Sequence, residues 1–337
     1  MVKFGISITP NKPINEWIKL VKKAEDYGLE YAWVADESPS YPFRDVFVTL
    51  ASIAMNTKRI KLGTSVCNPY TRHFAMIAVA VLSLDEISNG RAVLGIGAGG
   101  SLTLSPLKIE MWHKPIKIVK EAIKLIKSLF SGETVNSNEE FLKAKGIKLF
   151  DIPKHRIPIY LAARSPKMLR LIGELADGAL LSSLPTQYVK EALEYIKEGT
   201  LKANRSFNEL DIAHLSRLSI SYNEKEAKDA VRINIAYSIA DSPIEVLERF
   251  GIKRNEWEAL KKALNEKGLE FAKEFVTDKM IDILAIAGSP EECIKRCKEY
   301  IKAGVTQLVF SSPFGPNPEE GLRLLGEEVI PKLKLTG

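Results

Sequence analysis

The first 35 residues read MVKFGISITPNKPINEWIKLVKKAEDYGLEYAWVA, and they contain one strand–helix–strand pattern. Apolar, β-branched runs predict strands at Val2–Ile8 and Glu30–Ala35. The apolar residues between these runs recur at helical spacing: Ile14, Trp17, Ile18, Val21 and Ala24. Gly28 follows this stripe and is placed to cap the helix at its C-terminus. The stretch therefore predicts the repeating unit of a parallel α/β protein.

The same alternation continues along the rest of the chain. Six further runs predict strands, at Arg59–Val66, Ala92–Gly97, Ile157–Ala162, Gly178–Ser182, Asp211–Ser221 and Thr306–Ser311. Helical stripes at Ala75–Leu84 and Ile116–Leu129 lie between strands. Eight strands with helical crossovers favour a (β/α)8 TIM barrel, and a doubly wound parallel sheet is the alternative.

Two segments interrupt this rhythm. Residues 132–150 predict a short β-hairpin inserted before the fifth strand. Residues 223–286 are almost wholly helical in pattern and too long for a crossover. We interpret them as a helical insertion late in the barrel that covers one side of its mouth, and we expect one domain over residues 1–337.

The composition excludes several classes of function. The 337 residues include 48 Lys and Arg against 42 Asp and Glu, a net charge of +6, and no run resembles a basic nucleic-acid arm. No stretch of about 18 uninterrupted apolar residues predicts a membrane span, and the N-terminus has no signal-peptide pattern. We therefore expect a cytoplasmic protein that acts on a small molecule, without nucleic-acid or membrane partners.

Three cysteines and four histidines predict neither a disulfide scaffold nor a metal site. Cys293 and Cys297 lie four apart on a predicted helix with no further ligand near them, so we interpret them as small buried apolar residues. The histidines show no metal-binding spacing: His73, His113, His155 and His214.

In a TIM barrel the chemistry gathers at the carboxyl ends of the strands. The residues at these ends are Ser7, Asp36 with Glu37, Ser65–Asn68, Gly97–Gly100, Ala162–Ser165, Ser182 with Ser183, and Ser311 with Ser312. Most of them are small, and small residues let a flat ligand approach the backbone. The alternative is that loops favour Ser and Gly for their own turns.

Asp36 and Glu37 form a pair of adjacent acids at the end of the second strand. Neighbouring residues on a strand point to opposite faces, so the two acids are expected to have different roles. One can hold a cofactor while the other acts as a general acid or base. The alternative is that both only cap the following turn.

Two segments are candidates for binding a phosphate group. Gly95–Gly100 matches G-x-G-x-x-G, but it follows the fourth strand and the next helix is expected near Lys114, so we do not interpret it as a dinucleotide site. In Ala162–Lys167, Ser165 suits a helix N-cap and Pro166 the first helical position. Free amides there, with Arg164 and Lys167 beside them, favour an anion site over an ordinary capped helix.

Several long motifs resemble the bacterial-luciferase-like flavin and deazaflavin enzymes. They are Cys67–His73 (CNPYTRH), Ile87–Ala92 (ISNGRA), Met280–Asp282 with Ile286–Gly288, and Ala303–Gln307 running on to Ser312–Pro316. Within that superfamily the sequence is most similar to the coenzyme F-420-dependent 5,10-methylenetetrahydromethanopterin reductases. The resemblance covers nearly the full chain.

This resemblance implies a luciferase-like TIM barrel with coenzyme F-420, an 8-hydroxy-5-deazaflavin, bound across the strand ends. It also implies a non-proline cis peptide after the third strand, and the matching bond is Ser65–Val66. The residues expected around the ring and phosphate of the cofactor are Asp36, Ser65, Val66, Asn68, Gly97, Gly99, Ala163, Arg164 and Ser165. A homodimer or higher homo-oligomer through barrel helices is implied as well.

The acids of the reductase pattern differ in this chain. Ser7 ends the first strand and Gly100 follows the fourth, where the reductases carry acids. Glu37 stands where the superfamily usually has His, and it is the remaining titratable group expected at the mouth. We therefore expect Glu37 to be the catalytic proton donor, with Asp36 beside it holding the cofactor.

Three hypotheses for the function follow. The first is an F-420-dependent oxidoreductase that moves a hydride between the reduced deazaflavin and an electrophilic carbon, with a methylenetetrahydropterin as the candidate substrate. The second is an FMN-dependent monooxygenase of the same superfamily. The third is a flavin- or deazaflavin-binding protein without catalytic activity.

Overall fold

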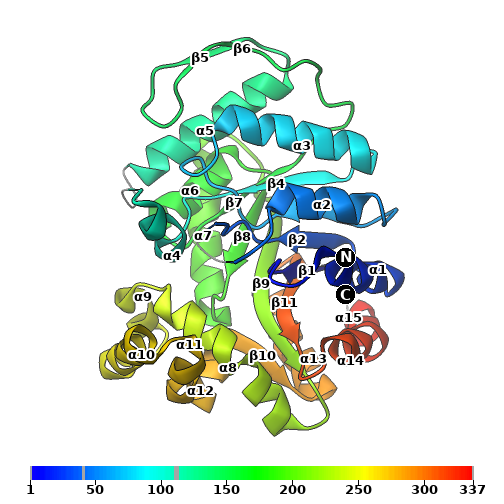
Figure 1. Ribbon diagram of the computed structural model, residues 1–337, viewed down its shortest axis with the longest axis vertical. Helices are drawn as coiled ribbons and strands as arrows, with labels where there is room; N and C mark the ends of the chain where they lie inside the picture. The colour runs from blue at the N-terminus through cyan, green and yellow to red at the C-terminus, as the bar shows by residue number, and fades with distance from the viewer. Residues whose placement is uncertain (1, 40–41, 110–113, 336–337) are drawn as a thin grey trace. The chain divides into compact units, whose positions relative to one another are not determined.

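The computed structural model describes residues 2–39, 42–109 and 114–335. Its central sheet closes on itself, because β9 pairs both with β8 and with β11. The barrel strands, in their order in the sheet, are β11 (Gln307–Phe314), β1 (Lys3–Ile8), β2 (Tyr31–Val34), β3 (Lys61–Thr64), β4 (Ala92–Ile96), β7 (Ile159–Ala162), β8 (Gly178–Ser182) and β9 (Asp211–Ile220). The fold is a TIM barrel, as predicted, and the doubly wound alternative is wrong (Figure 1).

Helices connect the strands. The connecting helices are α1 (Ile14–Asp26), α2 (Val46–Ala54), α3 (Phe74–Ser88), α5 (Pro115–Phe130), α6 (Pro166–Leu175), α7 (Thr186–Lys202), α13 (Pro290–Lys302), α14 (Pro318–Leu324) and α15 (Ile330–Lys334), with 3-10 turns at Ser105–Leu107 and Phe207–Glu209 and a π-helical turn at Leu325–Val329. The stripe predicted for α1 is confirmed, because Trp17, Val21 and Ala24 are buried. Gly28 follows that helix with φ 77°, a left-handed conformation that favours glycine.

The chain divides into two compact units. The N-terminal unit consists of Gly5–Leu181 and Glu191–Ala213, and the C-terminal unit contains the other described residues. Strands β1 and β9 each run from one unit into the other. Every residue predicted for the cofactor lies in the N-terminal unit.

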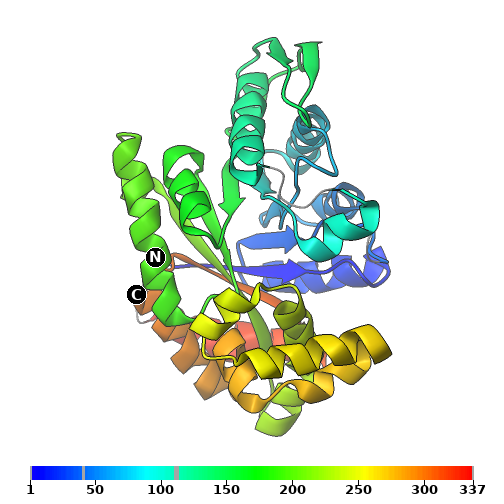
Figure 2. The same cartoon turned by 90° about the vertical axis from the view of Figure 1, so that its left-hand side faces the viewer.

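The C-terminal unit carries the long segment between β9 and β10. It holds α8 (Glu224–Ala240), α9 (Ile244–Arg249), α10 (Arg254–Lys267), α11 (Leu269–Ala272), a 3-10 turn (Lys273–Phe275) and α12 (Asp278–Leu284), which bury a common apolar core (yellow and orange in Figure 2). The expectation of helix up to residue 286 is wrong at its end. β10 (Ala285–Gly288) pairs in parallel with residues 217–220, because β9 is long enough to offer this second partner.

Two features precede β7. Residues 132–150 contain the antiparallel pair β5 (Val135–Ser137) and β6 (Ala144–Ile147). A four-residue helix, α4 (Ser101–Leu104), starts directly after Gly100, where we expected no helix before Lys114. It ends where Pro106 enters the following 3-10 turn, so it lacks the length of the helix that opens a dinucleotide site.

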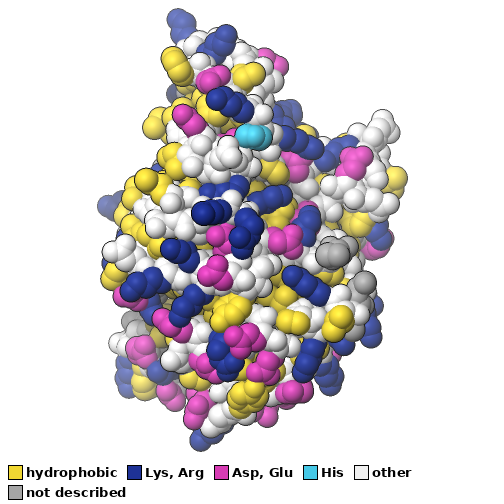
Figure 3. Space-filling view, turned by 90° about the vertical axis from the view of Figure 1, so that its right-hand side faces the viewer, with side chains coloured by type: hydrophobic (Ala, Val, Ile, Leu, Met, Phe, Trp, Pro, Cys, Tyr) yellow, Lys and Arg dark blue, Asp and Glu magenta, His cyan; other side chains and the backbone are white. Residues whose placement is uncertain are grey.

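The described residues contain no helix that combines the length and apolar character needed to cross a membrane. On the face drawn in Figure 3, Lys and Arg side chains are interspersed with Asp and Glu side chains. The charge is therefore mixed on this face, as the even spread of charges along the sequence predicts.

Glu25 ties the end of α1 to the start of β3. Its buried carboxylate accepts hydrogen bonds from the backbone N–H groups of Lys58 at 2.9 Å, Arg59 at 2.6 Å and Ile60 at 2.8 Å. Burial opposes ionisation of this group. The three hydrogen bonds outweigh burial and hold the pKa of Glu25 below its ordinary value.

Replacing Glu25 with Gln should lower the free energy of unfolding by about 1–3 kcal/mol at neutral pH, because the three N–H groups lose an ionised acceptor. Since the folded-state pKa is lowered, this stabilisation exists above the ordinary pKa and is lost as the pH falls through the folded value. Urea unfolding at about pH 7 and about pH 3 measures the difference. Exposed Glu30→Gln is the control, and an equal loss at both pH values would contradict the assignment.

Candidate active site

The carboxyl ends of neighbouring strands bring most of the predicted residues to one rim. β1, β2, β3, β4 and β7 follow one another in the sheet, so the segments after them are neighbours. Ser7 Oγ lies 3.4 Å from Ser65 Oγ, across from the first to the third strand end. The backbone N–H of Gly97 donates to the Cys67 carbonyl at 2.9 Å. The segments that follow these strands therefore lie side by side in the N-terminal unit, in contact through small side chains and backbone groups.

The end of β3 lies tightly against β4. The Ser65–Val66 peptide bond is cis, which confirms that expectation. A Cβ on Gly97 would lie 2.9 Å from Val66 Cγ2, and a Cβ on Gly95 would lie 1.9 Å from the Thr64 carbonyl oxygen. Both positions therefore require glycine for close strand packing. The first glycines of the G-x-G-x-x-G pattern serve the sheet, which agrees with rejecting a dinucleotide site.

Asp36 is a buried acid at the end of β2. Its side chain is 2% exposed, and its Oδ2 accepts a hydrogen bond from Arg72 Nε at 3.1 Å. The Cys67 thiol is a second hydrogen-bonding partner. Burial is the largest influence and raises the pKa of Asp36, while Arg72 and Cys67 oppose that rise. The protein therefore holds this carboxylate in place with partners that favour its charged form.

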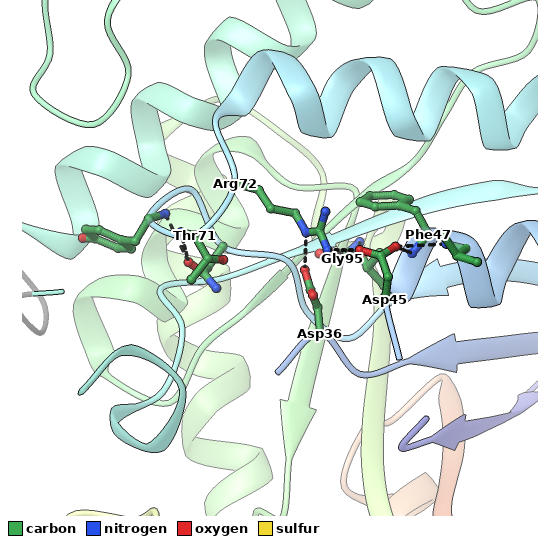
Figure 4. Close-up of polar contacts among 10 residues, drawn as sticks. Asp36, Asp45, Phe47, Thr71, Arg72 and Gly95 are labelled. Atoms are coloured by element: carbon green, nitrogen blue, oxygen red, sulfur yellow. Dashed lines mark hydrogen bonds and ion pairs between the residues drawn. The ribbon is translucent and has the colours of Figure 1, made fainter. Parts of the chain in front are cut away.

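Arg72 joins Asp36 to a second acid, Asp45. Arg72 Nη2 donates to Asp45 Oδ2 at 2.5 Å, and Asp45 Oδ1 caps α2 by accepting from the N–H groups of Phe47 and Val48 (Figure 4). Neither Arg72 nor Asp45 is predicted as a site residue from the sequence. Asp45 carries a usable signal, because an Asp directly before an apolar helix is a typical N-cap. Arg72 lies inside the CNPYTRH motif but 36 residues from Asp36, so no local pattern reports the pair.

Glu37 has a different environment from its neighbour. Asp36 is buried, whereas Glu37 is partly exposed. The contrast agrees with the expectation that adjacent acids after a strand point in different directions. An acid that reaches solvent can exchange protons with water, and a buried, paired acid is better suited to holding a fixed charge.

The segment after β7 begins a helix whose first turn has a special feature. Ser165 is the N-cap residue of α6 and Pro166 is at the first helical position, as predicted. The Ser165 side chain itself makes no capping hydrogen bond. Ala163 is buried, while Arg164 and Ser165 are exposed. A helix start without a side-chain cap and with an adjacent guanidinium fits an anionic group.

Comparison with known proteins identifies the family. The luciferase-like monooxygenase family matches residues 2–307. The chain belongs to this family.

Its relatives include two named reductases. The 5,10-methylenetetrahydromethanopterin reductase of Archaeoglobus fulgidus is 41% identical over 99% of this chain and 100% of its own length. That of Methanolobus tindarius is 38% identical over 97% and 99%. The solved structure of the coenzyme F-420-dependent tetrahydromethanopterin reductase from Methanopyrus kandleri has a TM-score of 0.89 at 33% identity, with 98% of this chain and 99% of that chain covered.

The CNPYTRH motif of this luciferase-like chain is used to build the loop after β3. Asn68 is buried, and its Oδ1 accepts from the N–H groups of Tyr70 at 3.1 Å and Thr71 at 2.9 Å. His73 Nδ1 accepts from the Ala75 N–H at the start of α3. Asn68 also lies beneath Gly99, whose added Cβ would be 3.3 Å from Asn68 Cγ. Asn68 therefore has a structural duty in addition to any contact with a ligand.

Proposed function

We propose that the chain is a coenzyme F-420-dependent oxidoreductase that transfers a hydride to the methylene carbon of 5,10-methylenetetrahydromethanopterin. The observation that carries this proposal is identity of 35–41% with three such reductases over at least 97% of the chain. More distant relatives at 26–28% identity are named F-420-dependent glucose-6-phosphate dehydrogenases, so the cofactor recurs where the substrate differs.

The rim fits a deazaflavin. Gly97 packs closely on Val66, because an added Cβ would lie 2.9 Å from Val66 Cγ2, and we propose that the flat ring lies over this surface. Ser65, Val66 and Asn68 border the same surface from the end of β3. Ala163, Arg164 and Ser165 would hold the phosphate at the start of α6, with Arg164 supplying positive charge.

Titration with F-420 and, separately, with FMN tests the proposal. We expect F-420 to bind at micromolar or lower concentrations and FMN more weakly, and we expect the loaded protein to reduce the methylene carrier. A preference for FMN would contradict the proposal and favour the monooxygenase hypothesis. Cofactor binding without turnover would favour the non-catalytic one.

The same titration tests the phosphate contact. Arg164→Ala should weaken F-420 binding by about 1–3 kcal/mol, the range of a charge-assisted hydrogen bond. The loss should shrink as salt is raised, because screening reduces the wild-type advantage. Lys167→Ala removes a second exposed cation, at the second position of α6, and should change affinity less.

Two adjacent acids would divide the chemistry. When bound, reduced F-420 supplies the hydride. A nitrogen of the carrier must be protonated as its bond to the methylene carbon opens, and Glu37 is the proposed donor of that proton from its carboxyl group. Asp36, fixed by Arg72, would contact the cofactor as an ionised hydrogen-bond acceptor. Ser7 and Gly100 offer no acid at the neighbouring strand ends.

Glu37→Gln should lower kcat by about 10²- to 10⁴-fold, the usual share of general acid catalysis, and leave F-420 affinity nearly unchanged. Asp36→Asn should do the reverse and affect binding more than turnover. Steady-state kinetics of both variants, together with fluorescence titration of F-420, separates the two roles. Normal turnover by Glu37→Gln would show that the proton comes from another group.

We also propose that two chains associate through α2 and α3. The outward faces of these neighbouring helices expose large apolar side chains: Val48 at 57%, Met55 at 78%, Met76 at 64%, Val79 at 46% and Ile87 at 49%. Apolar patches on adjacent helices are typical of interfaces between proteins. Isologous contact of such a patch with itself gives a homodimer, and a second patch would allow a higher homo-oligomer.

Met76→Glu should therefore yield a monomer, because association would bury an unpaired charge. Light scattering coupled to size-exclusion chromatography measures the mass. Phe150→Glu is the control, since Phe150 is an exposed apolar residue of the N-terminal unit that lies outside α2 and α3. A monomeric wild type, or an unchanged dimer in Met76→Glu, would contradict this interface.

We propose further that residues 1–337 behave as a single luciferase-like domain. Because β1 and β9 run through both units, neither unit keeps its sheet when the other unfolds. Calorimetry should then show one unfolding transition, and two separate transitions would contradict the proposal.

We propose that the protein is located in the cytoplasm, where the buried thiols Cys67, Cys293 and Cys297 stay reduced. Cell fractionation tests this location.

A further inference from the structure

Four groups in the N-terminal unit form a row of alternating charge. The first turn of α2, with its N–H groups, faces Asp45; Asp45 pairs with Arg72; and Arg72 pairs with Asp36. The Arg72 guanidinium also lies 5.4 Å from the centre of the Phe47 ring. The two hydrogen bonds to acids use different nitrogens, Nε for Asp36 and Nη2 for Asp45. The planar fork of arginine is what allows one side chain to hold both acids.

The exposed fraction of the side chain differs sharply among the three charged residues of this row. The Asp36 side chain is 2% exposed, Arg72 28% and Asp45 41%. A carboxylate as buried as Asp36 loses its hydration and needs a compensating charge to stay ionised. Burial disfavours the charge of Arg72 too, but Asp36 and Asp45 outweigh it and raise the pKa of Arg72. Arg72 is therefore a permanent cation next to a buried acid.

We infer that Arg72 is a positioning residue for the active site, which holds the Asp36 carboxylate ionised and in one orientation at the end of β2. Asp45 and the start of α2 fix the guanidinium from its other side. That Asp36 contacts the cofactor rests on the proposed function; the hold of Arg72 on Asp36 does not.

The groups around Asp36 raise or lower the pKa of its carboxyl group. Burial raises the pKa of Asp36 most, and the negative charge of Asp45 raises it further. Arg72 and the Cys67 thiol act in the opposite direction. Cys67 contributes as a neutral donor, because burial and the nearby Asp36 charge raise the pKa of its thiol well above the ordinary value. Among the described residues that shift the pKa of Asp36, Arg72 therefore supplies the positive charge.

The first arm of the experiment needs no cofactor. When an acid has a raised pKa in the folded state, the protein becomes less stable as the pH rises from the unfolded-state pKa of that acid to its folded-state pKa. Removing Arg72 raises the folded-state pKa of Asp36 further. Arg72→Gln should therefore shift the urea midpoint down more at about pH 7 than at about pH 4.5. Asp45 also loses a partner in this variant. Repeating both measurements in an Asp36→Asn background retains the Asp45 effect and isolates the Asp36 part.

Three results are decisive in this arm. A pH-dependent loss in Arg72→Gln that shrinks in the Asp36→Asn background supports the inference. A loss equal at both pH values, or unchanged by Asp36→Asn, overturns it. Arg170→Gln is the matched control, because Arg170 pairs with Glu198 at 2.6 Å in the same unit, but Glu198 is 52% exposed where Asp36 is 2% exposed. Its effect should be small at both pH values.

The second arm measures F-420 affinity against pH. Arg72→Gln should bind F-420 about tenfold or more weakly near neutrality, and the acid limb of its affinity profile should move to higher pH. Arg72→Lys restores the charge without the fork, so its acid limb should return towards that of the wild type while its affinity recovers only in part. An unmoved acid limb in Arg72→Gln overturns the inference. Coupling in the first arm without F-420 binding by the wild type overturns the proposed cofactor and leaves Arg72 as the residue that holds Asp36.

Discussion

The burial of one carboxylate at the end of β2 explains much of the structure around it. Asp36 keeps 2% of its side chain exposed, and an unpaired charge at such a site would be strongly destabilising. The loop after β3 must therefore deliver Arg72 to it, and α2 must present Asp45 to the other side of Arg72. Cys67 enters the same arrangement from the end of β3. The start of α2 and the loop after β3 are therefore both fixed by the need to pair a single buried carboxylate.

That loop also connects the strand ends to the hairpin of β5 and β6. His73 Nε2 lies 2.9 Å from the Lys143 carbonyl oxygen, and Tyr70 packs edge-on against Phe141 at 5.1 Å between ring centres. A shift of the hairpin would therefore also move the backbone between Asn68 and His73, which carries Arg72. Through these two contacts and Arg72, the inserted hairpin is connected to the buried Asp36 carboxylate.

The parts of this protein that could be predicted from the sequence are those set by local pattern. The period of α1 and the left-handed position of Gly28 follow from neighbouring residues, and the eight barrel strands follow from short β-branched runs. β10 was missed because a four-residue apolar run beside a helix carries no period of its own. By contrast, the start of α6 follows from local pattern, because Ser165 is its N-cap residue and Pro166 is at its first position. Arg72 and Asp36 meet only through tertiary structure, so their pairing had no local signal.

The same pairing gives a physical reason for two acids in succession. Adjacent carboxyl groups compete, because a charge on one disfavours a charge on the other. A site that needs one fixed anion and one proton donor must therefore decide which acid keeps its charge. Arg72 contacts Asp36, the buried member of the pair, and the partly exposed Glu37 is the one with access to solvent. The guanidinium thus favours the charged form of the buried acid, and the division of roles that we propose gives the proton transfer to Glu37, the acid with access to solvent.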